Sequence, residues 1–167
     1  MATAEKLYNT GEFLRASKEY EVLVKASPTL VPARVGLIRA YLKMEKVKDA
    51  FDSANLGLAE DLNSAPLHSV MGDVRFRRGE LAQAEGEYRS ALNTDKQNID
   101  AILGLARIYT AFSLHKRAYE LVNAAHKIAP DNPEVQRAWL RTLSSKERIQ
   151  ALEEYLKGSH GETEETK

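Results

Sequence analysis

The chain contains no cysteine among its 167 residues. It therefore has no disulfide framework, no thiolate zinc ligand and no cysteine nucleophile. Proline and glycine are sparse, at 5 and 9 residues, which argues against a loop-rich or disordered chain. No run reaches the roughly 18 apolar residues that a membrane span requires. The opening residues contain no apolar stretch, so we expect neither a signal peptide nor a membrane segment in this sequence. The sequence does not indicate a cellular compartment.

Net charge is also absent, because 24 basic side chains balance 24 acidic ones. A nucleic-acid-binding protein is usually basic overall or in one block, so we predict no nucleic-acid partner. The length suits one domain or one compact repeat array with a sizeable core.

The sequence repeats every 34 residues. Four alanines fall in register without a gap: Ala16, Ala50, Ala84 and Ala118. Apolar or small residues follow each alanine at helical spacing, and turn-forming glycines precede it in two repeats, as Gly11 and Gly79. A long fixed period is typical of stacked repeats, and a plain helical bundle does not need one.

Each repeat is predicted to be two antiparallel helices joined by a short turn. Ser64, Asn98 and Asn132 share one repeat position and are predicted N-caps. Prolines lie within the first helical turn, where a missing N–H costs little, at Pro32, Pro66 and Pro133. The alanine column marks where paired helices approach closely. One helix pair cannot bury its apolar face alone, so we predict an all-α solenoid of stacked pairs.

This pattern resembles the tetratricopeptide repeat family. The third repeat matches best, with Gly72, Gly79, Leu81, Ala84, Tyr88 and Ala91, and the first repeat matches in Gly11, Phe13, Ala16, Tyr20 and Pro28. The second and fourth repeats depart from the pattern at Glu45, Ala54, Gly57, Leu62, Ser113 and Val122. The resemblance implies a right-handed superhelical solenoid that acts as an interaction scaffold.

The repeats are expected at about 1–30, 31–64, 65–98, 99–132 and 133–157. By register the first helix would begin before Met1. A one-residue deletion near Ser144 would shift a closing helix, with Ser144 and Glu147 as its capping box. The solenoid would then span 1–157, followed by a polar, acidic tail or linker at 158–167. These ends favour the repeat region of a larger protein.

The family's inner surface is formed mainly by the first helix of each pair. Those positions give an expected partner-binding groove of Tyr8, Arg39, Leu42, Lys43, Asp73, Phe76, Arg77, Arg107, Arg137 and Arg141. Cations beside an aliphatic and aromatic strip suit a protein or peptide with acidic and apolar side chains, because guanidinium groups bind carboxylates in a planar fork. The alternative is a solvated face whose charges pair with one another, such as Asp73 with a neighbouring arginine.

One branch of the family grips the terminal carboxylate of chaperone tails with a Lys/Asn/Asn/Lys/Arg clamp. The corresponding positions hold Met1, Glu5, Gly36, Pro66 and Val70, and a shift by one repeat gives Val35, Arg39, Val70, Asp100 and Gly104. Neither set forms a clamp, so we predict no binding of that type.

Catalytic and metal-binding signatures are absent from the sequence. His68, His115, His126 and His160 are scattered, and no HExxH, GxSxG or GxxxxGK[ST] motif occurs. We therefore predict no enzymatic activity, no cofactor and no metal, and interpret the histidines as surface or packing residues.

Three interpretations of function stay open. The first is a protein-interaction module. The second is a non-catalytic accessory domain of a larger enzyme, because the chain is similar to repeat regions that precede aspartic protease domains in some bacterial proteins. The third is self-association, as a homodimer formed through an incomplete first repeat with an uncovered face.

Overall fold

The computed structural model describes residues 1–143 and 147, and all regular structure in this part is helical. The helices are α1 (Ala2–Asn9), α2 (Phe13–Ala26), α3 (Val31–Lys43), α4 (Val47–Glu60), α5 (Ala65–Arg77), α6 (Leu81–Thr94), α7 (Ile99–Ala111), α8 (His115–Ile128) and α9 (Pro133–Thr142). Helices α3, α5, α7 and α9 begin 34 residues apart, as do α2, α4, α6 and α8. The predicted all-α solenoid is confirmed, with the repeat length read from the sequence.

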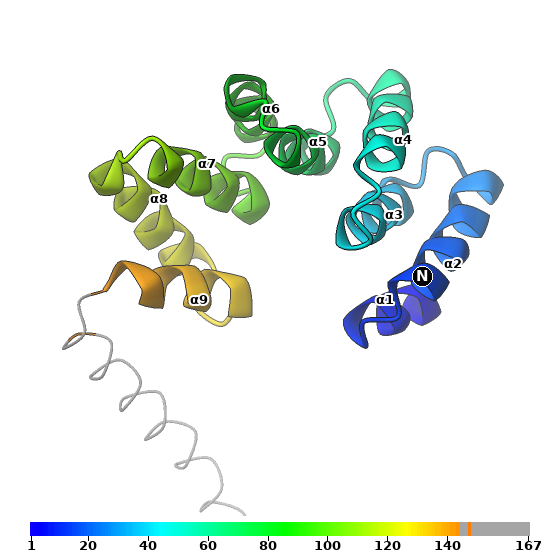
Figure 1. Cartoon of the computed structure of the whole chain (residues 1–167), viewed down its shortest axis with the longest axis horizontal. Coiled ribbons are helices and arrows are strands. Elements are labelled where there is room, and N and C mark those ends of the chain that lie inside the picture. The colour runs from blue at the N-terminus through cyan, green and yellow to red at the C-terminus, as the bar shows by residue number, and fades with distance from the viewer. Residues whose placement is uncertain (144–146, 148–167) are drawn as a thin grey trace, which may run out of the picture.

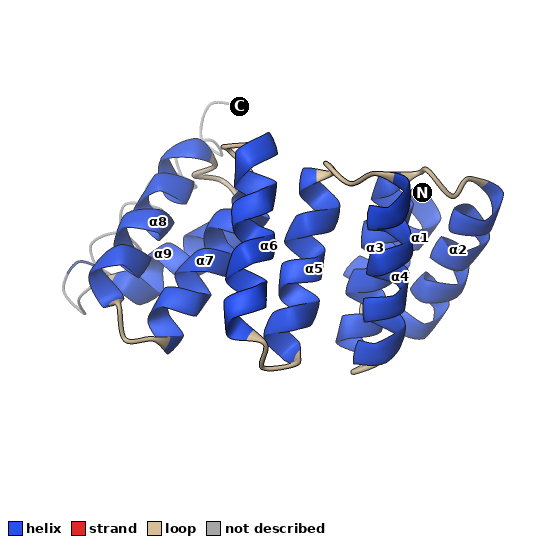
Figure 2. Ribbon diagram, turned by 90° about the horizontal axis from the view of Figure 1, so that it is seen from above, coloured by secondary structure: helices blue, strands red, loops and turns tan. Residues whose placement is uncertain are grey.

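The helices form an arch of two layers (Figure 1). Helices α1, α3, α5, α7 and α9 line its inner side, and α2, α4, α6 and α8 cover the outside. Seen from above, the connecting turns gather at two opposite edges (Figure 2). Each helix packs against its neighbour in sequence, and α5 also packs against both α3 and α7. This stacking buries the apolar faces that a single pair would leave exposed. No helix in the described ranges has the length and apolar character needed to cross a bilayer.

Two of the predicted N-caps bond as expected. The Asn98 side chain accepts from the backbone N–H of Ala101, and the Asn132 side chain accepts from the N–H groups of Glu134 and Val135. Ser64 occupies the same position before α5 without a side-chain capping bond. The prolines of α3, α5 and α9 stand in the first two helical positions, as predicted.

The turn within each repeat requires a left-handed backbone. Gly11 and Gly79 have φ of 83° and 76°, and the non-glycine residues Glu45 and Ser113 adopt φ of 57° and 58° at the same repeat position. The next residue donates its N–H to a carbonyl five residues earlier, as Leu114 does to Tyr109. The sequence departures at Glu45 and Ser113 therefore keep the turn and leave backbone strain in it.

Replacing Ser113 or Glu45 by glycine is expected to stabilise the chain. A left-handed conformation costs an L-residue about 1–2 kcal/mol. Glycine removes this cost, but its greater flexibility stabilises the unfolded state by about 0.5–1 kcal/mol. A net gain of roughly 0.5–1 kcal/mol should raise the urea midpoint followed by circular dichroism. Gly79→Ala, at the same position of repeat three, should lower it. A gain from Gly79→Ala would show that the turn does not carry this strain.

The alanine column lies where the two layers meet. Ala16, Ala50 and Ala84 are fully buried, and Ala118 is nearly so. This placement confirms that small side chains mark the contact between the helices of each pair.

Side chains at the position four residues after each alanine are matched in size to their neighbours. Tyr20 and Tyr88 fill the space that side chains at Gly36 and Gly104 would occupy, since an added Cβ would lie 2.4 Å and 2.3 Å from the two rings. Tyr88 also fills the space beside Gly72. A large ring on the outer layer is thus accommodated by glycine on the inner layer.

In the second repeat the large and small side chains are exchanged between the two layers. Ala54 takes the place of the tyrosine, and it packs in one core cluster with Ile38 and Val70, which take the places of Gly72 and Gly104. The departure at Ala54 is therefore compensated in volume by its two neighbours, which preserves the dense packing of the interior.

The predictions for the two ends are only partly tested. Helix α1 has 8 residues against 13 in α3, α5 and α7. The predicted closing helix at 146–157 and the tail at 158–167 lie outside the described residues, apart from Glu147. Ser144, which was predicted to form a capping box with Glu147, also lies outside the described residues.

Candidate functional site

The inner side of the arch carries a network centred on Asp73 of α5. The Asp73 carboxylate accepts bonds from the guanidinium of Arg107 on α7 and from the hydroxyl of Tyr88 on α6, the latter at 2.8 Å. Arg107 also donates to the Tyr88 oxygen at 3.1 Å and lies 5.3 Å from the centre of the Phe76 ring. Burial of Tyr88, followed by the negative charge of Asp73, raises the pKa of this phenol above its ordinary value. The phenol therefore stays a neutral donor.

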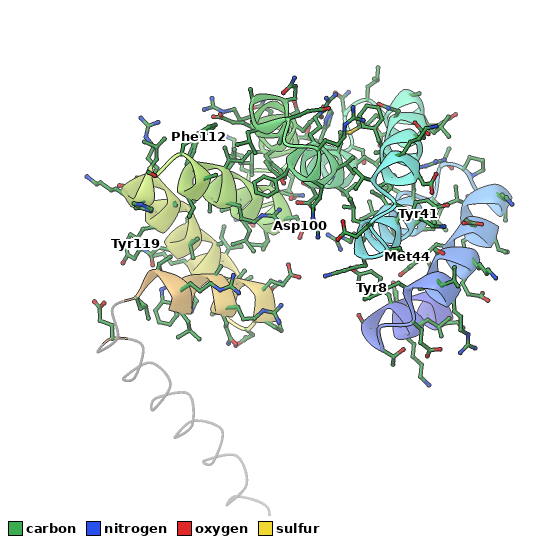
Figure 3. The ribbon with its side chains drawn as sticks, viewed as in Figure 1. Tyr8, Tyr41, Met44, Asp100, Phe112 and Tyr119 are labelled. Atoms are coloured by element: carbon green, nitrogen blue, oxygen red, sulfur yellow. The ribbon has the colours of Figure 1, made fainter. Side chains whose placement is uncertain are left out.

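A second ion pair crosses from α3 to α7. Arg39 donates to Asp100 at 2.5 Å, although 61 residues separate them in sequence. Burial acts to lower the pKa of Arg39, but the charges of Asp100 and Asp73 outweigh it, and the pKa is raised. Because the two side chains remain 40% and 41% exposed, the pair adds only about 0.2–1 kcal/mol. Asp100 lies on the concave side of the arch, as does Tyr8 (Figure 3).

The other predicted cations differ in their partners. Arg77 donates to Glu45 at 2.8 Å in an exposed pair between neighbouring repeats. Arg137 lies 4.0 Å from Glu134 within α9. Lys43 and Arg141 are exposed, and neither has an ion-pair partner among the described residues. The alternative of internally paired charges thus holds for part of the surface and leaves two free cations.

The apolar groove residues divide between surface and core. Tyr8 is half-buried, with its ring edge-on to Phe13 at 5.3 Å. Phe76 is half-buried beneath Arg107. Leu42 is only 7% exposed and packs in the core cluster of α3, α4 and α5. We therefore leave Leu42 out of the candidate surface; its helical neighbour Lys43 faces solvent.

A hollow of about 350 Å³ opens on this side between α1 and α3. Tyr8 and Tyr20 supply aromatic wall, Val35 and Gly36 lie on α3, and Glu5 and Arg39 supply charges. The family's inner-surface positions include Tyr8 and Arg39 but not Tyr20, Gly36 and Asp100, which also lie in this region. The signal for Tyr20 and Gly36 was available, because Tyr88 and Gly104 repeat both residues 68 positions later.

Two histidines have structural partners outside this surface. His68 contacts Glu87 at 2.8 Å and the carbonyl of Leu62 at 2.9 Å through its two ring nitrogens. His126 stacks on Trp139 with ring centres 4.1 Å apart. No cluster of three or more metal-ligating side chains occurs in the part of the chain that the structure describes.

Comparison with known proteins agrees with this architecture. Residues 75–140 match a family model described as a tetratricopeptide repeat. A thermophilic tetratricopeptide repeat protein of Thermus thermophilus superposes with a TM-score of 0.74 at 19% identity, covering 83% of this chain and 77% of its own. The chain has the fold of a tetratricopeptide repeat solenoid.

Other solved structures share the tetratricopeptide repeat fold at low identity. The crystal structure of MamA gives a TM-score of 0.60 at 22% identity, over 99% of this chain and 97% of that one. The first tetratricopeptide repeat domain of Spaghetti (RPAP3), solved with an HSP90 peptide, gives 0.59 at 23% identity, over 67% and 89%. None of the curated proteins compared matches the chain. These similarities establish the fold, and they leave the ligand to be argued from this chain's own residues.

Proposed function

We propose that this solenoid is a protein-interaction module whose inner face binds a partner segment with acidic and apolar side chains. The observation that carries the proposal is that Lys43 and Arg141 are exposed without an ion-pair partner among the described residues, on the same layer of helices as the half-buried rings of Tyr8 and Phe76. Lysine and arginine without internal partners can bind a ligand carboxylate without first breaking an ion pair. Half-buried rings supply contact area at a small cost in side-chain entropy.

The peptide complex of a related fold supports this proposal. The RPAP3 domain was solved with the peptide SRMEEVD, which carries acidic and apolar residues. In this chain the clamp positions hold Glu5, Gly36 and Pro66, among others. We therefore propose recognition through side chains of the partner, with no grip on a terminal carboxylate. The module itself is proposed to be non-catalytic, as a scaffold for a partner protein.

Reversing the exposed cations of the inner helices is expected to remove partner binding. The test variant is Lys43→Glu with Arg77→Glu and Arg141→Glu; Arg77 is included because its ion-pair partner, Glu45, is itself exposed. Arg39 and Arg107 are spared because their loss would leave Asp100 and Asp73, which are less exposed, unpaired. Proteins captured by the wild type in an affinity pull-down should bind the variant at least about tenfold more weakly when measured individually by calorimetry.

The matched control carries the same change in charge on the outer layer. Lys18, Lys25 and Lys127 are exposed on α2 and α8, and their joint replacement by glutamate should leave affinity unchanged. Equal weakening by both triple variants would show that overall charge, rather than the inner face, governs binding. Unchanged affinity in the inner variant would overturn the proposed function.

A further inference from the structure

The hollow between α1 and α3 has a counterpart two repeats later. Glu5, Tyr8, Tyr20, Val35, Gly36 and Arg39 recur, 68 positions on, as Asp73, Phe76, Tyr88, Leu103, Gly104 and Arg107. Each member is replaced by the same residue or by one of the same chemical class. The chain therefore holds two copies of one set of side chains, at equivalent places in the solenoid.

The two copies differ in where the arginine goes. In the later copy, Arg107 turns inward onto Asp73 and the Tyr88 hydroxyl, and it lies against the Phe76 ring. In the earlier copy, Arg39 donates to Asp100, a residue outside the set, on α7. Glu5 has no ion-pair partner among the described residues, and the hollow of about 350 Å³ lies beside it. The later copy thus shows the internally satisfied arrangement of this set, and the earlier copy shows an open one.

We propose that this hollow is a side-chain pocket for the bound segment, held open by the Arg39–Asp100 ion pair. The inference rests on the proposed function and names one subsite within it. Tyr8, Tyr20 and Val35 form apolar wall, and Gly36 also borders the hollow, with the Tyr20 ring occupying the place of a side chain there. The occupant is an aliphatic side chain of the size of leucine, because Tyr8, Tyr20 and Val35 offer apolar wall from α1, α2 and α3.

The charges around the pocket indicate that the bound segment carries an acidic residue adjacent to that leucine. Lys43 is one helical turn beyond Arg39 on α3, and it has no ion-pair partner among residues 1–143 and 147. Arg39 uses only one of its five N–H groups on Asp100. An acidic residue next to the leucine can therefore reach Lys43 and the remaining N–H groups of Arg39. The ligand class is a peptide segment in which leucine is adjacent to glutamate or aspartate.

Nuclear magnetic resonance tests the pocket with the hexapeptide acetyl-Gly-Ser-Leu-Glu-Glu-Ser-amide as probe. Titration into the ¹⁵N-labelled chain should shift the amide of Gly36 and leave the amide of Gly104 unmoved. Gly104 is an internal control, because Arg107 in its copy of the site is already bonded to Asp73 and Tyr88. Exchanging the leucine of the probe for serine should weaken binding by at least about tenfold.

Asp100→Asn is expected to close the pocket. Once released, Arg39 should turn to Glu5 and Tyr20 as Arg107 turns to Asp73 and Tyr88, so the probe should bind at least about tenfold more weakly. The double variant with Glu5→Gln should recover part of the affinity, since the closing carboxylate is gone. Asp52→Asn, which makes the same charge change on the exposed outer face of α4, is the control.

The other possible results of the peptide titration distinguish the pocket from inner-face binding in general. Probe shifts on α5, α7 and α9 with Gly36 unmoved would overturn the pocket and leave inner-face binding standing. Binding that is equal or tighter in Asp100→Asn would overturn the role of the ion pair. Absence of any probe-induced shift would overturn the pocket, while the charge-reversal experiment with the captured partner judges the proposed function independently.

Discussion

Tyr88→Ala should cost about 3–5 kcal/mol of unfolding free energy, the range for removing a large buried ring. Tyr88 is fully buried, and its ring fills the space beside both Gly72 and Gly104. Neither glycine has a side chain that could move into the cavity. Urea unfolding followed by circular dichroism would measure the loss as a lower midpoint.

The second repeat supplies a rescue for this variant. It carries Ile38, Ala54 and Val70 at the positions of Gly72, Tyr88 and Gly104. The triple variant Gly72→Ile, Tyr88→Ala, Gly104→Val should therefore recover much of the stability lost by Tyr88→Ala alone. Tyr88→Phe keeps the ring and removes the bond to Asp73, so it should cost only about 1–2 kcal/mol. If the triple variant were less stable than the single one, size compensation between layers would be wrong.

Gly104→Ala should destabilise the chain by about 1–3 kcal/mol, as overpacking of a dense interior does. An added Cβ would stand 2.3 Å from two atoms of the Tyr88 ring, far inside van der Waals contact. The ring is held in place by its hydroxyl bond to Asp73, and the loss should appear as a lower urea midpoint.

Gly86→Ala is the matched control for this prediction. Gly86 lies within α6, is exposed, and has nothing within 4 Å of an added Cβ. Alanine is favoured over glycine in a helix interior by about 0.5–1 kcal/mol, so this variant should be more stable than the wild type. Opposite signs at two helical glycines would show that contact with Tyr88, rather than helix propensity, decides the effect at Gly104.

The inner face combines two uses of charge. Arg39 and Arg107 are bound by carboxylates of the chain itself, whereas Lys43 and Arg141 have no such partner in the described portion. Paired arginines orient helices and shape the hollow, and free cations remain available to a ligand. The proposed preference for acidic segments accordingly rests on the free cations.

Much of the architecture follows from local sequence signals. The 34-residue period predicted the spacing of the helix pairs, since corresponding helices begin at the same repeat position. Asn98 and Asn132 cap their helices as their residue type predicts. Leu42 shows the limit of this reasoning. Its position within the repeat predicted an exposed side chain, but packing in the core leaves only 7% of it exposed.

The sequence by itself determined the fold class, the repeat length and the inner helices, because capping, proline placement and apolar spacing act within a few residues of one another. Only the tertiary structure decided that Arg39 pairs with Asp100 and Arg107 with Asp73, although Arg39 and Arg107 share one repeat position. The choice depends on how the arch brings α7 towards α3. That curvature is set by packing summed over several repeats, and no single repeat encodes it.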